Sequence, residues 1–289
     1  MDTEELLKRV RRIEIKAKGL STNIFAGEYH SAFKGRGMAF SEVREYQYGD
    51  DIRDIDWNVT ARFDRPHIKI YEEERELTVI LMIDVSGSLD FGTSQQSKRQ
   101  MATEIAATLA FSAIQNNDKI GVIFFSNKIE KFIPPQKGRK HILHIIRELL
   151  NLQPKCHETN IGTAIEFMTN AIKKRCTVFI ISDFFDEKDY SKEIQIANRR
   201  HDIIALQIYD QRMLELPNVG IMTLRDNETG EITFIDTSSK SLRNSHHEWW
   251  IKHQTKLNAI LSSAKVDCTH IRTDEDYVKG ISSLFKRRK

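Results

Sequence analysis

Asp84, Ser86 and Ser88 form a D-x-S-x-S pattern directly after an apolar run of the chain. All three side chains offer oxygen, and the loop that carries them contains no cysteine or histidine. Oxygen donors with few formal charges suit a hard cation such as Mg²⁺ or Mn²⁺. The residue types therefore predict a divalent cation site. Ordinary helix capping remains an alternative, because aspartate and serine also commonly precede the first turn of a helix.

The elements before these side chains indicate how they are positioned. Residues 77–83 carry apolar or β-branched side chains, which is typical of a strand buried on both faces of a mainly parallel sheet. Residues 177–184 repeat this pattern and end in Ser182, Asp183 and Phe184. Because open α/β sheets bind ligands beyond the carboxyl ends of their strands, we expect Asp84 and Asp183 to share one crevice.

Thr159 supplies a fifth oxygen donor in this hypothesis. It stands in the loop before a predicted helix at 160–174, where its hydroxyl could complete the shell around the cation. Capping of that helix explains Thr159 equally well, so both interpretations stay open at this point.

The rest of the chain predicts a doubly covered sheet. Strands alternate with helices from 77 to 285, which is typical of a three-layer α/β sandwich with a mostly parallel sheet. A short link predicts that residues 129–133 form an antiparallel edge strand beside 118–126. Residues from 220 onward predict a hairpin. Further strands are expected at 202–209 and 267–273, and helices at 96–116, 141–152, 190–200, 241–263 and 274–285.

Residues 1–76 look different from residues 77–289, and we treat the two ranges as separate parts. The first range predicts an amphipathic helix at 4–16, followed by an extended, loop-rich arm with scattered glycines. In the arm, acids and arginines alternate around aromatic residues such as Tyr48 and Phe63. Aromatic side chains of this size suggest that the arm packs on another surface. Local pairing of Arg53 and Arg62 with nearby aspartates is the simpler alternative.

Composition limits the function classes. The chain of 289 residues is 40% hydrophobic and 29% charged, as in soluble globular proteins. A net charge of +3 gives no reason to expect nucleic acid as the main partner. Three widely spaced cysteines, no secretory leader and no apolar run of spanning length predict a cytoplasmic protein without a transmembrane segment.

The five oxygen-bearing positions resemble the metal-ion-dependent adhesion site (MIDAS) of von Willebrand factor A-type domains. The resemblance covers residues 77–210 well and the C-terminal part loosely. It implies that Ser86, Ser88 and Thr159 bind Mg²⁺ directly. It also implies that Asp84 and Asp183 act directly or through water, and that an acidic side chain of a partner completes the octahedron.

The arm resembles a bacterial family of unknown function with a von Willebrand factor A-like domain, typically encoded beside MoxR-type AAA+ ATPases. Its G-x-x-F, R-x-Y, G-D-D-x-R-x-I-D-W and A-R elements recur between positions 37 and 62. The charged and aromatic positions among them are candidate partner-binding residues: Arg44, Tyr46, Asp50, Asp51, Arg53, Asp56, Trp57 and Arg62.

These resemblances imply a non-enzymatic, divalent-cation-dependent protein-binding module. It would act as an adaptor or co-chaperone of a MoxR-type ATPase in protein or metal-cofactor assembly, on a partner that offers an Asp or Glu. The alternative is a metal-dependent phosphohydrolase that uses Asp84. That chemistry normally needs a further acid and a Lys or Arg aimed at phosphate, and the D-x-S-x-S loop holds neither the second acid nor a phosphate-binding Walker pattern.

Overall fold

The computed structural model describes residues 13, 14, 17, 39–63, 65–72, 77–93, 96–154, 156–225, 227 and 230–288. The chain divides into two compact units, one of residues Lys34–Leu77 and one of Met1–Phe33 with Thr78–Lys289. The predicted helix at 4–16 and the first part of the arm lie almost wholly outside the described residues.

A mixed sheet forms the centre of the larger unit. Within the described residues it has six strands in the order β10-β7-β6-β3-β4-β5. All neighbouring pairs are parallel except β4 and β5, so β5 is the predicted antiparallel edge strand. The strands are β3 (Thr78–Asp84), β4 (Lys119–Phe125), β5 (Ile129–Gln136), β6 (Thr177–Ser182), β7 (Asp202–Tyr209) and β10 (Asp267–Arg272).

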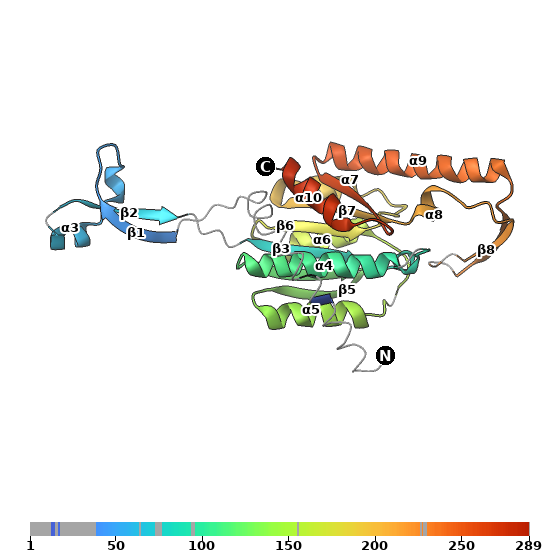
Figure 1. Cartoon of the computed structure of the whole chain (residues 1–289), viewed down its shortest axis with the longest axis horizontal. Coiled ribbons are helices and arrows are strands. Elements are labelled where there is room, and N and C mark those ends of the chain that lie inside the picture. The colour runs from blue at the N-terminus through green and yellow to red at the C-terminus, as the bar shows by residue number, and fades with distance from the viewer. Residues whose placement is uncertain are drawn as a thin grey trace. The chain divides into compact units, whose positions relative to one another are not determined.

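Helices cover both faces of this sheet (Figure 1). Helices α6 (Ile161–Ala171), α7 (Ser191–Arg200) and α9 (Lys240–Ser263) share one core with alternate residues of the strands. The other face is covered by α4 (Lys98–Gln115), α5 (Arg139–Asn151) and α10 (Tyr277–Arg287). In Figure 1, α4 runs alongside β3. The predicted three-layer α/β sandwich is therefore confirmed.

The order of the strands reverses beside β3. After β3, the chain adds β4 and β5 on one side of the sheet and then returns to add β6, β7 and β10 on the other side. The connections that leave β3 and β6 consequently run to opposite faces of the sheet, which makes a topological switch point at their carboxyl ends; we call this region the crevice. Asp84 ends β3, and Ser182 ends β6 directly before Asp183. The topology thus brings the two predicted carboxylates to one rim.

The C-terminal part adds the predicted hairpin and a long helix. Strands β8 (Ile221–Arg225) and β9 (Ile232–Asp236) pair in antiparallel fashion, with several exposed apolar side chains. A short helix, α8 (Gln211–Leu214), precedes them and contacts α9. No helix within the described ranges has the length and apolar character to cross a membrane.

The smaller unit contains more regular structure than the sequence predicted. Strands β1 (Ala39–Glu45) and β2 (His67–Glu72) form an antiparallel pair, with a 3₁₀ turn η2 (Ile52–Asp54) and a short helix α3 (Trp57–Phe63) between them. This pairing was not predicted, because β1 lacks a clean alternation of apolar and polar residues and β2 alternates only over residues 67–70. The η2 turn and α3 bury no residue of their own.

Candidate functional site

Asp84 is held at the centre of the crevice by two neutral donors. Its Oδ1 accepts a hydrogen bond of 2.9 Å from the Ser86 amide, and its Oδ2 accepts one of 2.6 Å from the Ser182 hydroxyl. Asp84 is fully buried, and the negative charge of Asp183 lies nearby. Burial, and then repulsion by Asp183, raise the pKa of the Asp84 carboxyl above its ordinary value. A cation at this position would relieve both effects.

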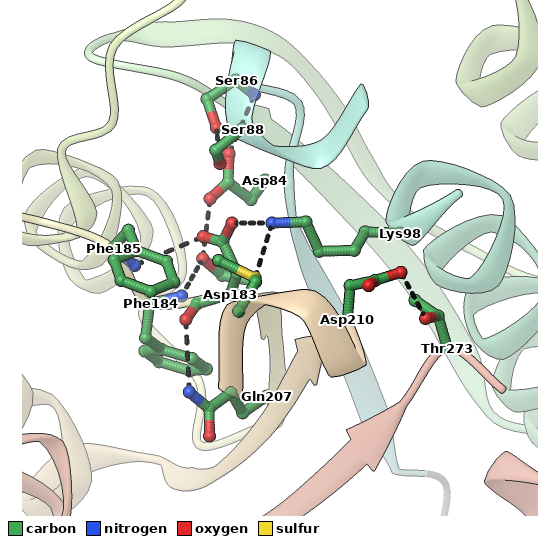
Figure 2. A network of polar contacts seen from close by, with 12 residues as sticks. Asp84, Ser86, Ser88, Lys98, Asp183, Phe184, Phe185, Gln207, Asp210 and Thr273 are labelled. Atoms are coloured by element: carbon green, nitrogen blue, oxygen red, sulfur yellow. Dashed lines mark hydrogen bonds and ion pairs between the residues drawn. The ribbon is translucent and has the colours of Figure 1, made fainter. Parts of the chain in front are cut away.

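Ser86 and Ser88 present their hydroxyl oxygens side by side. The two Oγ atoms are 3.1 Å apart, and Figure 2 shows both beside Asp84. Adjacent ligands of an octahedral Mg²⁺ at 2.0–2.1 Å stand about 2.9 Å apart, so this spacing fits two neighbouring positions of one shell. Ser86 precedes the 3₁₀ turn η3 (Gly87–Asp90), but its side chain makes no capping hydrogen bond there. The capping alternative therefore does not explain these serines.

The Thr159 loop lies next to the serine turn. The Gly87 amide donates to the His157 carbonyl at 2.9 Å, and the Asn160 amide donates to the Ser126 carbonyl at the end of β4 at 3.0 Å. Thr159 is buried, with 8% of its surface exposed. The N-cap of α6 is Asn160, whose side chain accepts from the Thr163 amide. The N-cap of this helix is thus Asn160, the neighbour of Thr159.

Asp183 has a partner that sequence reasoning missed. Its Oδ2 lies 2.6 Å from the Nζ of Lys98, and both side chains are buried, with 1% exposure for Lys98 and 0% for Asp183. Figure 2 shows Lys98 reaching the Asp183 carboxylate from α4. Lys98 was not predicted as a site residue, because it is one lysine among many and lies ten residues after Ser88. Its place as the first residue of α4 is the one signal that could have identified it.

The loop after β6 contains a residue in a strained, left-handed backbone conformation. Phe184 has a φ of 60°, which is unusual for a bulky residue and costs of the order of 1–3 kcal/mol. The Phe184 amide donates to the Ser182 hydroxyl at 2.9 Å, and the Phe185 amide donates to Asp183 Oδ1 at 3.3 Å. Farther along, Asp186 accepts from the Ile161 amide at 2.7 Å. These contacts tie Asp183 to the helix that follows Thr159.

The donor set determines which metals fit. Among the residues that the structure describes, no group of three or more His, Cys, Asp or Glu side chains is placed to hold a metal ion. Asp210, another aspartate after a strand, is already engaged by Thr93 and Thr273. The crevice thus offers two carboxylates and serine hydroxyls, a set that suits Mg²⁺ or Mn²⁺ rather than zinc or copper. Cation binding by the five predicted residues stays a prediction.

The model of a protein family of unknown function, DUF58, matches residues 42–256, which is most of the chain. The chain belongs to this family. The match begins inside β1 and continues past the crevice into α9, so the DUF58 region includes both the second half of the arm and the candidate site.

Relatives and solved structures resemble this chain without adding a function. "Uncharacterized protein Rv1480" of Mycobacterium tuberculosis is 28% identical over 291 residues, covering 100% of this chain and 92% of its own. An aerotolerance-related membrane protein from Bacteroides fragilis matches with a TM-score of 0.52 at 15% identity, covering 73% of this chain and 98% of its own. The SpRpn10 VWA domain matches with a TM-score of 0.38 at 12% identity, covering 74% and 95%.

In this DUF58 chain an aromatic cluster borders the crevice. Phe185 stacks on Trp249 and on His253, with ring centroids 5.3 Å and 4.1 Å apart. Trp249 is 48% exposed, whereas Trp250 is 5% exposed. Only one of these adjacent tryptophans therefore faces the core. We call Phe185, Trp249 and His253 the aromatic ledge.

The candidate partner-binding residues of the arm fall into two classes. Arg44 forms two hydrogen bonds of 2.8 Å with Asp50, and Asp51 and Asp56 accept from backbone amides that follow them. The simpler alternative paired Arg53 and Arg62 with Asp50, Asp54 or Asp56. In the structure Arg44 occupies both carboxylate oxygens of Asp50, and Lys69 lies 3.4 Å from Asp56. The remaining candidates are half-buried or exposed: Tyr46 is half-buried, and Arg53, Trp57 and Arg62 are exposed.

Proposed function

We propose that this protein is a non-enzymatic module that binds an acidic side chain of a protein partner through a divalent cation. The observation that carries the proposal is the convergence of Asp84, Ser86 and Asp183 at the switch point of the sheet. There the Ser86 and Ser88 oxygens already have the spacing of neighbouring metal ligands.

The cation would supply a fixed binding geometry. Ser86, Ser88 and Thr159 would hold it from one side, while Asp84 and Asp183 would offset its charge. Mg²⁺ and Mn²⁺ favour octahedral oxygen shells, so a ligand position left for a partner accepts a carboxylate only from a restricted direction. A weak surface contact would thereby become specific and dependent on the cation.

Two exposed surfaces suit such a partner. The aromatic ledge begins two residues after Asp183 and offers the exposed ring of Trp249. In the other unit, Ile52, Trp57 and Phe63 have about two thirds of their surfaces exposed, at 66%, 67% and 66%. Contiguous patches of exposed apolar side chains mark binding surfaces, whereas single scattered apolar residues are normal on a protein surface. We assign the ledge and the arm to partner contact.

The partner that we propose is a MoxR-type AAA+ ATPase or its client, in the cytoplasm. The support is the resemblance of the arm to the family encoded beside such ATPases, together with the exposed aromatic residues that this arm carries. In this role the module would act as an adaptor or co-chaperone in protein or metal-cofactor assembly.

Phosphate-ester hydrolysis is the competing function. Lys98 supplies a cation beside two carboxylates, but its ammonium group is 1% exposed and paired with Asp183 rather than facing solvent. A screen of phosphate esters with Mg²⁺ tests this alternative, and turnover that disappears in Asp84→Asn would replace the binding proposal.

The direct test of the proposed partnership is a pull-down with a MoxR-type ATPase from the same genome. We expect capture in Mg²⁺, loss of capture in EDTA, and loss in Asp84→Ala. Glu166→Gln, which removes an exposed carboxylate from α6, is the matched control and should bind like the wild type. Capture that is equal in Mg²⁺ and EDTA would contradict a cation-dependent contact.

A further inference from the structure

Lys98 is placed at the crevice by the start of α4. Ser97 caps this helix, and Ser97 and Gln100 form a reciprocal capping box. The Lys98 amide donates to the Phe91 carbonyl at 3.1 Å, which fixes the first helical residue against the loop that follows η3. Its side chain therefore points inward from a rigid helix start.

The Lys98 ammonium is enclosed by the crevice. Its Nζ lies 2.6 Å from Asp183 Oδ2, 3.5 Å from the Met213 sulfur and 5.8 Å from the centroid of the Phe91 ring. Burial of an ammonium group is costly unless a counter-charge is present. Asp183 supplies that charge, so the lysine and the carboxylate form one internal pair.

This pair changes the charge of the candidate metal site. The two buried carboxylates, Asp84 and Asp183, carry two negative charges, and the neutral Ser182 hydroxyl and Ser86 amide that bind Asp84 offset neither of them. Lys98 contributes one positive charge at Asp183. A divalent cation together with Asp84, Asp183 and Lys98 would therefore carry a net positive charge. Without Lys98, the cation and the two carboxylates would sum to zero.

A site with surplus positive charge favours an additional anion. In a water-poor crevice such charges interact strongly, because the effective dielectric constant is low. A carboxylate that joins the cation would restore neutrality. Since coupling between two ligands is reciprocal, the carboxylate would then strengthen cation binding as much as the cation strengthens carboxylate binding.

We propose that Lys98 is a specificity-determining residue that makes cation binding and carboxylate binding depend on each other. This inference rests on the proposed function of the crevice. Lys98 keeps the cation weakly held until an acidic ligand arrives, so the metal-loaded state and the partner-bound state form together.

The experiment measures Mn²⁺ binding by the electron paramagnetic resonance signal of the free ion, in chloride and in acetate as a minimal carboxylate. The variants are Lys98→Gln, which removes the charge and keeps a hydrogen-bond donor to Asp183, and Lys98→Arg, which keeps the charge. Lys98→Met is a second neutral variant for the case that the glutamine protein is poorly folded, which circular dichroism checks.

In chloride, Lys98→Gln should bind Mn²⁺ about tenfold or more tightly than the wild type, and Lys98→Arg should bind like the wild type. Acetate should strengthen Mn²⁺ binding by the wild type and by Lys98→Arg, and much less by Lys98→Gln. Equal or weaker Mn²⁺ affinity of the neutral variants in chloride would overturn the role of Lys98 while leaving the cation site intact. Absence of Mn²⁺ binding in every variant would overturn the proposed function together with this inference.

Discussion

The crevice and the arm differ in which side chains they bury: the crevice buries charged groups, whereas the arm leaves large aromatic groups exposed. In the crevice, Asp84, Asp183 and Lys98 are buried and each is engaged by a nearby partner. In the arm unit, Arg44 and Asp50 bind each other locally while Trp57 and Phe63 remain exposed. The crevice is thus a preorganised site, whereas the arm presents an apolar surface that its own unit does not cover.

This difference separates two kinds of binding energy. A preorganised polar site gives direction and selectivity, because its groups lose little freedom when a ligand arrives. Exposed aromatic side chains give affinity through burial against a partner. Substitutions in the crevice should therefore affect folding and cation response, and substitutions of exposed arm residues should affect partner affinity alone.

The largest effect is expected at the buried ion pair. Asp183→Asn leaves the Lys98 ammonium buried without its counter-charge, and the free energy of unfolding should fall by about 3–5 kcal/mol. Urea denaturation measures this loss. The surface variant Glu166→Gln should stay within about 0.5 kcal/mol of the wild type.

A double-mutant cycle sharpens this result. Lys98→Met combined with Asp183→Asn should lose less stability than the sum of the two single variants, because the second substitution removes the stranded charge. Strict additivity would show that the two side chains do not depend on each other and would weaken the account of the crevice.

Trp57→Ala tests the arm. The loss of this exposed ring should weaken binding of the proposed ATPase partner by about 2 kcal/mol, as is common for tryptophans in interfaces, and leave the urea midpoint unchanged. Isothermal titration calorimetry gives the affinity. Ile196→Ala, which removes an exposed apolar side chain from α7, is the control and should bind normally. Equal losses in both variants would deny the arm a specific role.

Gly87→Ala should disturb the wall of the crevice more mildly. A Cβ at Gly87 would collide with the Asn227 carbonyl oxygen and would lie 3.3 Å from the Cβ of His157. Since the closest atom belongs to the backbone, the hairpin turn must shift, at a cost of about 1–3 kcal/mol. A thermal melt measures the cost. An unchanged melting temperature would show that Asn227 does not pack on the serine turn.

The smallest effect is electrostatic and confined to the arm. Hydrogen bonding by the Arg44 guanidinium lowers the pKa of Asp50, as does the Gln47 amide. Arg44→Gln should move this pKa back toward the ordinary value, which NMR titration of the carboxyl group detects. The pKa of Asp50 is lower in the folded protein than in the unfolded chain. Any stability from this pair is therefore fully present above the unfolded-state pKa and is lost as the pH falls toward and through the lower, folded-state pKa. A pKa that does not move would remove Arg44 as its cause.

The sheet and the rim could be predicted from the sequence because strong local patterns specify them. The apolar run before Asp84 and its repeat before Asp183 identified two neighbouring strands, and parallel strands that end together bring their last residues to one edge. Lys98 could not be found in this way, because its burial depends on how α4 packs on the sheet. The β1–β2 pairing of the arm was also missed, since β1 lacks a regular alternation and that of β2 extends over only four residues, 67–70.

The central claim is tested most directly by the thermal shift that Mg²⁺ produces in the wild type and in Asp84→Ala. A ligand that binds only the native state raises its melting temperature, with an increase that depends on concentration. We predict a saturable rise in the wild type, its loss in Asp84→Ala, and its retention in Glu166→Gln. A rise of the same size in Asp84→Ala, or no rise in the wild type, would contradict a cation site at this crevice.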